Sequence, residues 1–227
     1  MTRSSSGPAS PGSLHLLRGL GFDVHVIEAG PEVGGTWYWN RYPGARCDIE
    51  SIGYSYSWDP ELQQTWDWTE RYAAQPEILA YLRHVADRHD LRRDISFDTR
   101  VESLDFDPDT DTWTVTTDDD GHTTARFVIA ATGCLSKPLV PTFDGMDDFA
   151  GEVYWTWDWP EAGVDFSGQR VGVVGTGSSG VQTITAIAPD VGTLTVFQRT
   201  PAYAVPAQNR PIADELAQDA HPLRRVP

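Results

Sequence analysis

The stretch VGVVGTGSSGVQ, residues 171–182, decides the fold. Its first four residues read as a hydrophobic strand that runs directly into glycines at positions 175, 177 and 180. This is a complete G-x-G-x-x-G: the first glycine permits the turn, the second lets a pyrophosphate approach, and the third lets a helix pack on the strand. We therefore predict a strand, a nucleotide-binding turn and a helix over residues 181–188.

The strand that follows, TLTVFQRT (residues 193–200), indicates which dinucleotide binds. It ends in Gln198 and Arg199, where a site for NAD usually carries an acidic residue. An arginine soon after Gly180 suits a 2′-phosphate, so NADP(H) is favoured over NAD(H). The alternative is a solvated arginine at the end of a strand.

A second βαβ pattern lies near the start of the chain. Leucines between Leu14 and Leu20 have close to helical spacing, and the strand FDVHVIEAG (residues 22–30) follows. Glu28 holds the position of the acid that binds ribose hydroxyls, although a charged strand end can also be a solvated terminus. The expected upstream glycines fall near Ser5, Gly7 and Ser10, so we expect the first phosphate site to be truncated or replaced.

Between these patterns stands GGTWYWNRYPGARCD, residues 34–48, with four aromatic residues, two arginines, three glycines and a terminal carboxylate. Glycines let the backbone pass close to a flat ligand, while Trp37, Trp39 and Tyr42 offer stacking faces. Arg41, Arg46 and Asp48 add charge. The tract predicts a ligand site; an aromatic-rich loop that closes over a core is the alternative.

The remaining segments complete an α/β fold. An amphipathic helix is predicted from Pro76, with His84 and His89 on its solvated face. Period-two segments from Ile95 predict an antiparallel meander whose last strand, RFVIAATG (residues 126–133), is buried, with Asp118–Asp120 as an exposed hairpin tip. A Pro-rich linker places a domain boundary near Lys137. We predict two Rossmann-like units, both incomplete: residues 1–137, carrying the meander, and residues 138–227, for NADP.

Composition excludes several classes of protein. The net charge of −16 argues against nucleic acid or an anionic membrane as partner, because either would repel the chain. No run of 18 apolar residues occurs, and the start MTRSSSGPASPG lacks the apolar stretch of a secretion signal, so we expect a cytoplasmic protein. Cys47 and Cys134 show no metal-ligand spacing.

Taken together, these patterns resemble the class B flavoprotein monooxygenases, and more narrowly the Baeyer–Villiger monooxygenases of the phenylacetone, steroid and cyclohexanone type. Residues 34–48 fit the family tract G-G-x-W-x-x-x-x-[FY]-P-G-x-x-x-D without a miss. FAGEVYWTWDWP (residues 149–160) fits the second signature, F-x-G-x-x-x-H-x-x-x-W-P, except that Trp155 stands where the family has histidine. The resemblance covers about residues 14–211.

The resemblance implies a cofactor set and a reaction. NADPH would reduce FAD, and the C4a-peroxyflavin would insert oxygen from dioxygen into a ketone, with Asp48 as the catalytic carboxylate that positions an essential arginine in later sequence. Arg46 and Asp48 would lie where the two cofactors meet. FAD would contact Glu28, Gly35, Thr36, Trp37, Asp48, Tyr54 and Val101. NADPH would contact Gly175, Thr176, Gly177, Ser178, Ser179, Gly180, Val181, Gln182, Gln198 and Arg199.

Three departures from the family lower the activity expected of this chain alone. Trp155 can neither be protonated nor accept a hydrogen bond as a histidine does. The first glycine loop is altered, and the family's essential arginine lies beyond this chain. A non-catalytic nucleotide-binding fragment is therefore one alternative, and a flavin monooxygenase acting on nitrogen or sulfur is another. Because both predicted sheets are incomplete, we also expect exposed apolar edges and dependence on a partner chain or aggregation.

Overall fold

The computed structural model describes residues 9–212, and its tertiary contacts divide them into two compact units. The first unit contains residues 9–39 and 79–152, and the second contains residues 40–78 and 153–212. The division therefore falls inside the aromatic tract. The two predicted cofactor domains differ from these units, because they are defined by the cofactor that each would bind rather than by tertiary contacts. Their boundary near residue 137 stays a prediction.

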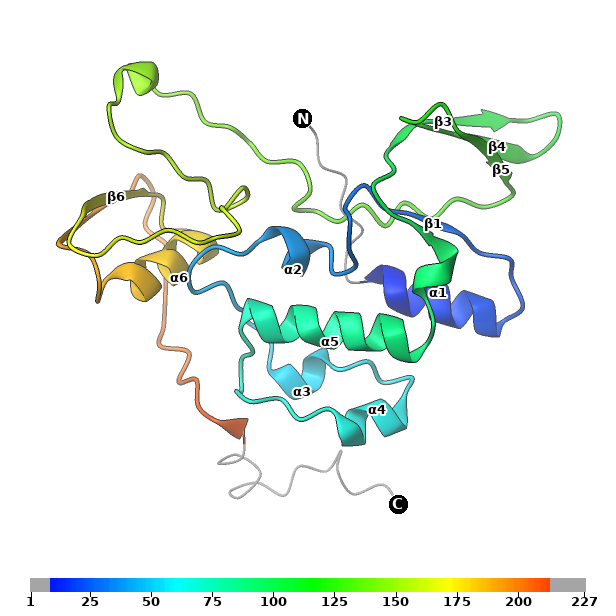
Figure 1. The fold of residues 1–227 in the computed structure, drawn as a ribbon, viewed down its shortest axis with the longest axis horizontal. Coiled ribbons are helices and arrows are strands. Elements are labelled where there is room, and N and C mark those ends of the chain that lie inside the picture. Colours follow the sequence, from blue (N-terminus) through cyan, green and yellow to red (C-terminus); the bar gives the residue numbers. More distant parts are fainter. Residues whose placement is uncertain (1–8, 213–227) are drawn as a thin grey trace. The chain divides into compact units, whose positions relative to one another are not determined.

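The core of the first unit forms around helix α1 (Ala9–Gly19), drawn in blue in Figure 1. Leu14 is 1% exposed and packs with Val33, Ala86 and Leu91, and the partly buried Val24, Val26, Ile95 and Phe97 surround this cluster. The helix ends at Gly19, and Gly21 follows with a φ of +85°, in the left-handed region that favours glycine. The predicted glycine positions at Ser5 and Gly7 lie outside the described residues.

The predicted strand over residues 22–30 is much shorter than expected. Strand β1 comprises only Val26–Ile27 and pairs in parallel with β2 (Ile95–Ser96), after the 3₁₀ helix Arg92–Asp94. A strand extends only as far as a neighbour supplies hydrogen-bonding partners, and within residues 9–212 that neighbour is two residues long. Ile95 and Ser96 thus belong to this parallel pair rather than to the meander.

Three antiparallel strands follow in the order β3 (Val101–Asp107), β4 (Thr112–Thr117) and β5 (His122–Ala125), visible in green in Figure 1. The register runs from Asp107 opposite Thr112 to Val101 opposite Thr117. Asp118–Asp120 form part of the turn between β4 and β5. The Asp119 carboxylate accepts hydrogen bonds from Thr117 and from the Gly121 amide, which lowers its pKa.

The prediction of a buried strand over residues 126–133 was wrong. These residues form no strand, and Phe127 and Ile129 are 70% and 64% exposed. Apolar residues in a short run predict a strand only if a neighbouring strand receives their backbone groups, and none of the described strands does so. The chain continues through the 3₁₀ helix Met146–Asp148 to the end of the unit.

The second unit places two short helices, α3 (Ser51–Tyr54) and α4 (Pro60–Thr65), before α5 (Gln75–Arg88). Asp59 caps α4 by accepting from the Leu62 amide at 2.9 Å, and Pro60 occupies the first turn, where its missing N–H is not needed. Helix α5 begins in this unit and continues into the first. The periodic apolar residues of α5 are buried, and His84 is exposed as expected; the buried residues are Ile78, Leu79, Leu82, Val85 and Ala86.

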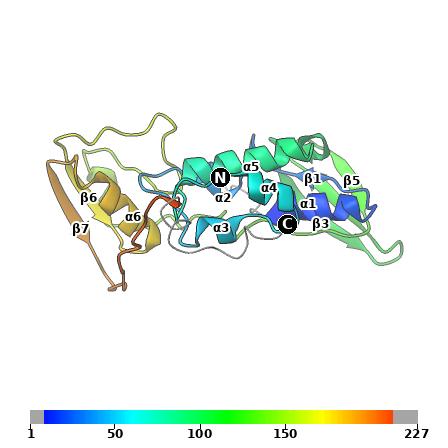
Figure 2. The same ribbon diagram turned by 90° about the horizontal axis from the view of Figure 1, so that it is seen from below.

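The same unit contains a βαβ element built from β6 (Arg170–Val174), α6 (Ser178–Ile187) and β7 (Thr193–Phe197). Figure 2 shows β6 and β7 beside α6, and the two strands pair in parallel from Arg170 opposite Thr193 to Val174 opposite Phe197. Helix α6 begins three residues earlier than predicted, at Ser178. Val174 and Phe197 are more than half exposed, as expected of so small a sheet.

Candidate cofactor site

The glycine loop between β6 and α6 is shaped for a ligand. Gly175 has a φ of +100°, and a side chain at Gly180 would overlap the Gly175 carbonyl oxygen, so the helix can approach the loop only because residue 180 is glycine. By contrast, no atom lies within 4 Å of a Cβ built at Gly177. The loop therefore has room at Gly177, as the pyrophosphate site predicted there would need.

The second half of the aromatic tract, residues 40–48, packs directly on α6. Gly44 has a φ of +78°, and a Cβ there would come within 2.5 Å of the Gln182 carbonyl oxygen and 3.0 Å of the Ala186 Cβ. Only glycine satisfies both the backbone angle and the close approach. Gly44 thus allows the tract to pack closely on α6.

The Gln182 side chain joins α6 to the tract. Its Oε1 accepts a hydrogen bond from the Tyr42 hydroxyl at 2.9 Å, and its Nε2 donates to the Arg46 carbonyl oxygen at 3.1 Å and to Asp48 Oδ1 at 3.4 Å. Asp48 Oδ2 accepts from the Ser178 hydroxyl at 3.1 Å. The carboxylate that ends the tract is therefore held at the start of α6, where the helix dipole favours negative charge.

Two neutral groups flank this carboxylate. Burial raises the pKa of Tyr42, and the negative charge of Asp48 adds to that shift, so the phenol keeps its proton and donates to Gln182. Burial also raises the pKa of the Cys47 thiol, with a further contribution from Asp48. Asp48 is thus the negative group of this cluster, because both neighbours remain protonated at neutral pH.

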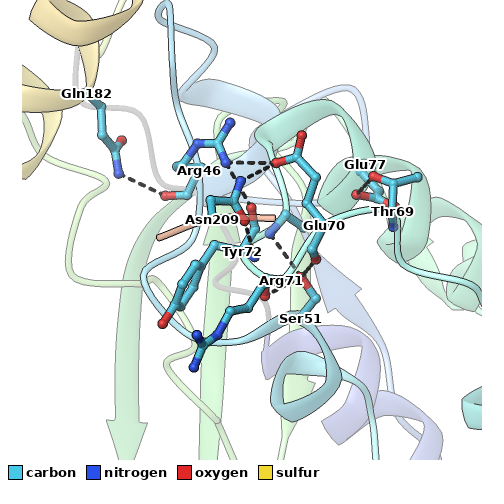
Figure 3. Close-up of polar contacts among 10 residues, drawn as sticks. Arg46, Ser51, Thr69, Glu70, Arg71, Tyr72, Glu77, Gln182 and Asn209 are labelled. Carbon is cyan, nitrogen blue, oxygen red and sulfur yellow. Dashed lines mark hydrogen bonds and ion pairs between the residues drawn. The ribbon is translucent and has the colours of Figure 1, made fainter. Parts of the chain in front are cut away.

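Arg46 is also held by residues outside the tract, as Figure 3 shows. Its Nη1 donates to Glu70 Oε2 at 2.8 Å and to the Tyr72 carbonyl oxygen at 3.0 Å. Desolvation alone would raise the pKa of Glu70, but hydrogen bonds from Arg46 and Asn209 outweigh it and lower the pKa. Arg41, the other arginine of the tract, pairs with Glu161 at 2.5 Å.

The end of β7 supplies the remaining predicted dinucleotide residues. Gln198 Nε2 donates to the Thr176 hydroxyl at 2.9 Å, which ties the end of β7 to the glycine loop. Arg199 is exposed, and within residues 9–212 no hydrogen bond or ion pair engages its guanidinium. An exposed arginine here fits the predicted contact with a 2′-phosphate, and it equally fits the alternative of a solvated arginine at the end of a strand.

In the first unit, Glu28 follows β1 and is only 2% exposed. Its Oε1 accepts from the Gly30 amide at 2.7 Å, and its backbone is hydrogen-bonded to Ser96 and Thr99. A small, partly open cavity lies against Glu28, and its other lining residues are Pro11, Val26, Val33, Gly34, Ile95 and Phe97. A buried carboxylate at the edge of a mainly apolar cavity fits the ribose role predicted from the sequence.

The other predicted flavin residues are divided between the units. Gly35, Thr36, Trp37 and Val101 belong to the first unit, where residues 36–39 form the short helix α2 (Thr36–Trp39) and Val101 begins β3. Tyr54, at the end of α3, belongs to the second unit together with Arg46 and Asp48. The structure therefore brings Arg46 and Asp48 together with the predicted NADP residues.

Trp155, the residue in place of the family histidine, stacks on Trp157 with a ring separation of 6.2 Å and an interplanar angle of 26°. Sequence reasoning missed two polar residues of the site, Glu70 and Asn209. Each lies in a segment without a motif, and the Glu70–Asn209 contact joins residues 139 positions apart. No local pattern could have revealed that pair.

Comparison with known proteins identifies the class to which this fold and site belong. Residues 6–212 match the family model described as pyridine nucleotide-disulphide oxidoreductase, so the chain belongs to that family. The resemblance to Baeyer–Villiger monooxygenases is confirmed. Acetone monooxygenase (methyl acetate-forming) of Gordonia sp. (strain TY-5) is 48% identical, with 90% of this chain and 38% of the relative covered.

Further relatives extend this comparison. A Baeyer–Villiger monooxygenase of Pseudooceanicola batsensis is 49% identical over 89% of this chain and 37% of its own length, and phenazine N-monooxygenase PhzNO1 of Lysobacter antibioticus is 47% identical over 88% and 37%. Oxidized steroid monooxygenase bound to NADP superposes with a TM-score of 0.91 at 54% identity, covering 97% of this chain and 43% of that one. The chain thus spans less than half the length of the relatives it matches.

A complex named OTEMO with FAD and NADP (form 3) superposes with a TM-score of 0.87 at 42% identity, covering 97% of this chain and 42% of that chain.

Two further observations concern metal sites and membrane-spanning helices. Among residues 9–212, no group of three or more His, Cys, Asp or Glu side chains is placed to hold a metal ion. No helix in that part of the chain is long and apolar enough to cross a membrane.

Proposed function

We propose that this chain binds FAD and NADP(H) and forms part of a monooxygenase that inserts an oxygen atom from dioxygen into a ketone. The proposal is supported by relatives that are named for ketone oxidation and by solved neighbours bound to FAD and NADP. Two Rossmann-like domains would divide the work, with residues 1–137 for FAD and residues 138–227 for NADP.

The observation that carries the proposal is the pair of hydrogen bonds from α6 to the Asp48 carboxylate. The signature tract and the glycine loop are about 130 residues apart in sequence, yet Ser178 and Gln182 both donate to the Asp48 carboxylate. An aromatic loop that only closed over a core would not need its carboxylate at a nucleotide-binding turn. The contact supports the interpretation that residues 40–48 border the dinucleotide.

The roles of the residues follow from their chemistry. Backbone N–H groups at Gly177 and the start of α6 would bind the pyrophosphate, Arg199 the 2′-phosphate, and Glu28 the ribose hydroxyls of FAD. FAD, when bound, supplies the oxygen-activating chemistry. Asp48 would act as an electrostatic and positioning group beside the reacting centre, and Tyr42 would hold Gln182 in register with the tract.

The test is a spectrum followed by a turnover assay. The purified protein, incubated with FAD and desalted, should retain blue absorbance, and it should then oxidise NADPH faster when acetone or cyclohexanone is added under air. Asp48→Ala is the active-site variant, and Glu61→Gln, on an exposed face of α4, is the matched control. A colourless protein that takes up no FAD would show that the chain is a non-catalytic fragment.

One observation favours a second candidate, oxidation at nitrogen. A phenazine N-monooxygenase is nearly as similar to this chain as the ketone-oxidising relatives. Product analysis separates the two reactions, because a ketone yields an ester or lactone whereas a phenazine yields an N-oxide. We place ketone oxidation first because more of the relatives carry that activity in their names.

A further inference from the structure

A short antiparallel β-ribbon in the second unit contacts Arg46 of the aromatic tract. Residues 209–212 run antiparallel to residues 69–72: Glu70 bridges Pro211, the Arg71 amide donates to the Arg210 carbonyl at 2.9 Å, and the Ile212 amide donates to the Thr69 carbonyl at 3.0 Å. Ile212 is only 6% exposed, which anchors the end of the ribbon. Asn209 is thereby fixed beside Glu70.

The Asn209 side chain closes a network around Arg46 (Figure 3). Its Nδ2 donates to Glu70 Oε2 at 2.5 Å, and its Oδ1 accepts from the Tyr72 amide at 3.0 Å. Glu70 Oε2 and the Tyr72 carbonyl are the two acceptors of Arg46 Nη1. Within the described part of the chain both guanidinium hydrogen bonds start from Nη1, so Nε and Nη2 keep their donors for another group.

The backbone of Arg46 is fixed separately. Its carbonyl accepts from Gln182 on α6, and residues 45–47 pair with residues 73–75 through the Cys47 and Gln75 amides. The side chain is 31% exposed, and an arginine at such a site loses rotamer entropy when a ligand orders it. A network that orders the guanidinium beforehand removes that cost from binding.

We propose that Asn209 is a positioning residue for Arg46: through Glu70 and Tyr72 it holds the guanidinium so that Nε and Nη2 are ready for an anionic dinucleotide. The inference rests on the proposed NADP site. Asn209 would act on that ligand indirectly, because within residues 9–212 its side chain hydrogen-bonds to Glu70 and Tyr72 rather than to Arg46 itself.

The experiment is a double-mutant cycle on NADP⁺ affinity, measured by calorimetry. Asn209→Ala keeps the charges of Arg46 and Glu70, so its effect on an anion comes from order rather than from net charge. We expect Asn209→Ala to weaken NADP⁺ binding about two- to tenfold when residue 46 is arginine, and to have no effect in the Arg46→Ala background. Glu50→Gln breaks the neighbouring Arg71–Glu50 pair and should leave the affinity unchanged.

Equal weakening in both backgrounds, or no weakening in either, would overturn the inference. A readout without ligand separates this outcome from failure of the proposed function. By NMR, hydrogen exchange of the Arg46 guanidinium protons should be slow in the wild type and faster in Asn209→Ala. If the wild type does not bind NADP⁺, the proposed function fails, and unchanged Arg46 exchange in Asn209→Ala would reject the positioning role as well.

Discussion

Replacement of Gly44 by alanine tests the packing of the aromatic tract on α6. The left-handed backbone at residue 44 costs a non-glycine residue about 1–2 kcal/mol. The new Cβ would also lie 2.5 Å from the Gln182 carbonyl oxygen, a backbone atom of a helix that cannot move alone. Such overpacking costs about 1–3 kcal/mol, so the two effects together should lower the free energy of unfolding by about 2–5 kcal/mol.

The assay is urea unfolding followed by tryptophan fluorescence. With a slope of about 2 kcal/mol per molar urea, the midpoint of Gly44→Ala should fall by about 1–2.5 M. Gly53→Ala is the matched control: its Cβ would meet only Ile49 Cγ2 at 3.9 Å, and alanine inside helix α3 should be neutral or stabilising by about 0.5–1 kcal/mol. A Gly44→Ala midpoint equal to that of the wild type would refute the close packing of residues 40–48 on α6.

Three further predictions concern the ligand and the pH dependence. Gly177→Ala should leave the urea midpoint nearly unchanged, because no protein atom lies within 4 Å of the new Cβ, but should weaken NADP⁺ binding about tenfold, a loss of about 1.4 kcal/mol; unchanged calorimetric affinity would contradict the loop assignment. Arg199→Ala should weaken NADP⁺ binding about 10- to 150-fold, as expected for hydrogen bonds to a charged phosphate, and leave NAD⁺ affinity unchanged; no loss for either dinucleotide would favour the solvated arginine. Glu70 has a lowered pKa, so its ion pair stabilises the fold above the unfolded-state pKa of about 4.3 and ceases to do so as pH falls through the lower folded-state value. Because the Glu70 side chain is 39% exposed, the advantage of the wild type over Glu70→Gln should be only about 0.2–1 kcal/mol at pH 6 and should vanish once the pH falls below the folded-state pKa of Glu70; a difference that persists in acid would contradict the network.

The elements predicted well from the sequence are those whose signal is local. The β6–α6–β7 element and its glycine loop follow from a strand, three glycines and a helix in one continuous stretch. Helix α5 follows from its apolar periodicity and the proline in its first turn. In each case neighbouring residues determine the structure, so one sequence is enough.

The failures share a physical cause, since each depended on a distant partner. Residues 126–133 have the composition of a buried strand, but no described strand pairs with them, and the strand predicted over residues 22–30 shrinks to the length of its two-residue neighbour. The Asp48–Ser178 and Glu70–Asn209 contacts join segments more than 100 residues apart. The sequence predicts a ligand site at residues 34–48, which stays a prediction, whereas the hydrogen bonds between this tract and α6 could not be predicted.

We propose that residues 40–48 and the start of α6 form one dinucleotide site. Amide hydrogen exchange by mass spectrometry, with and without NADP⁺, tests this proposal. We predict that NADP⁺ slows exchange in peptides covering residues 175–182 and also in peptides covering residues 42–48, while β3–β5 do not change. Protection confined to residues 175–182, or found in neither segment, would contradict the claim.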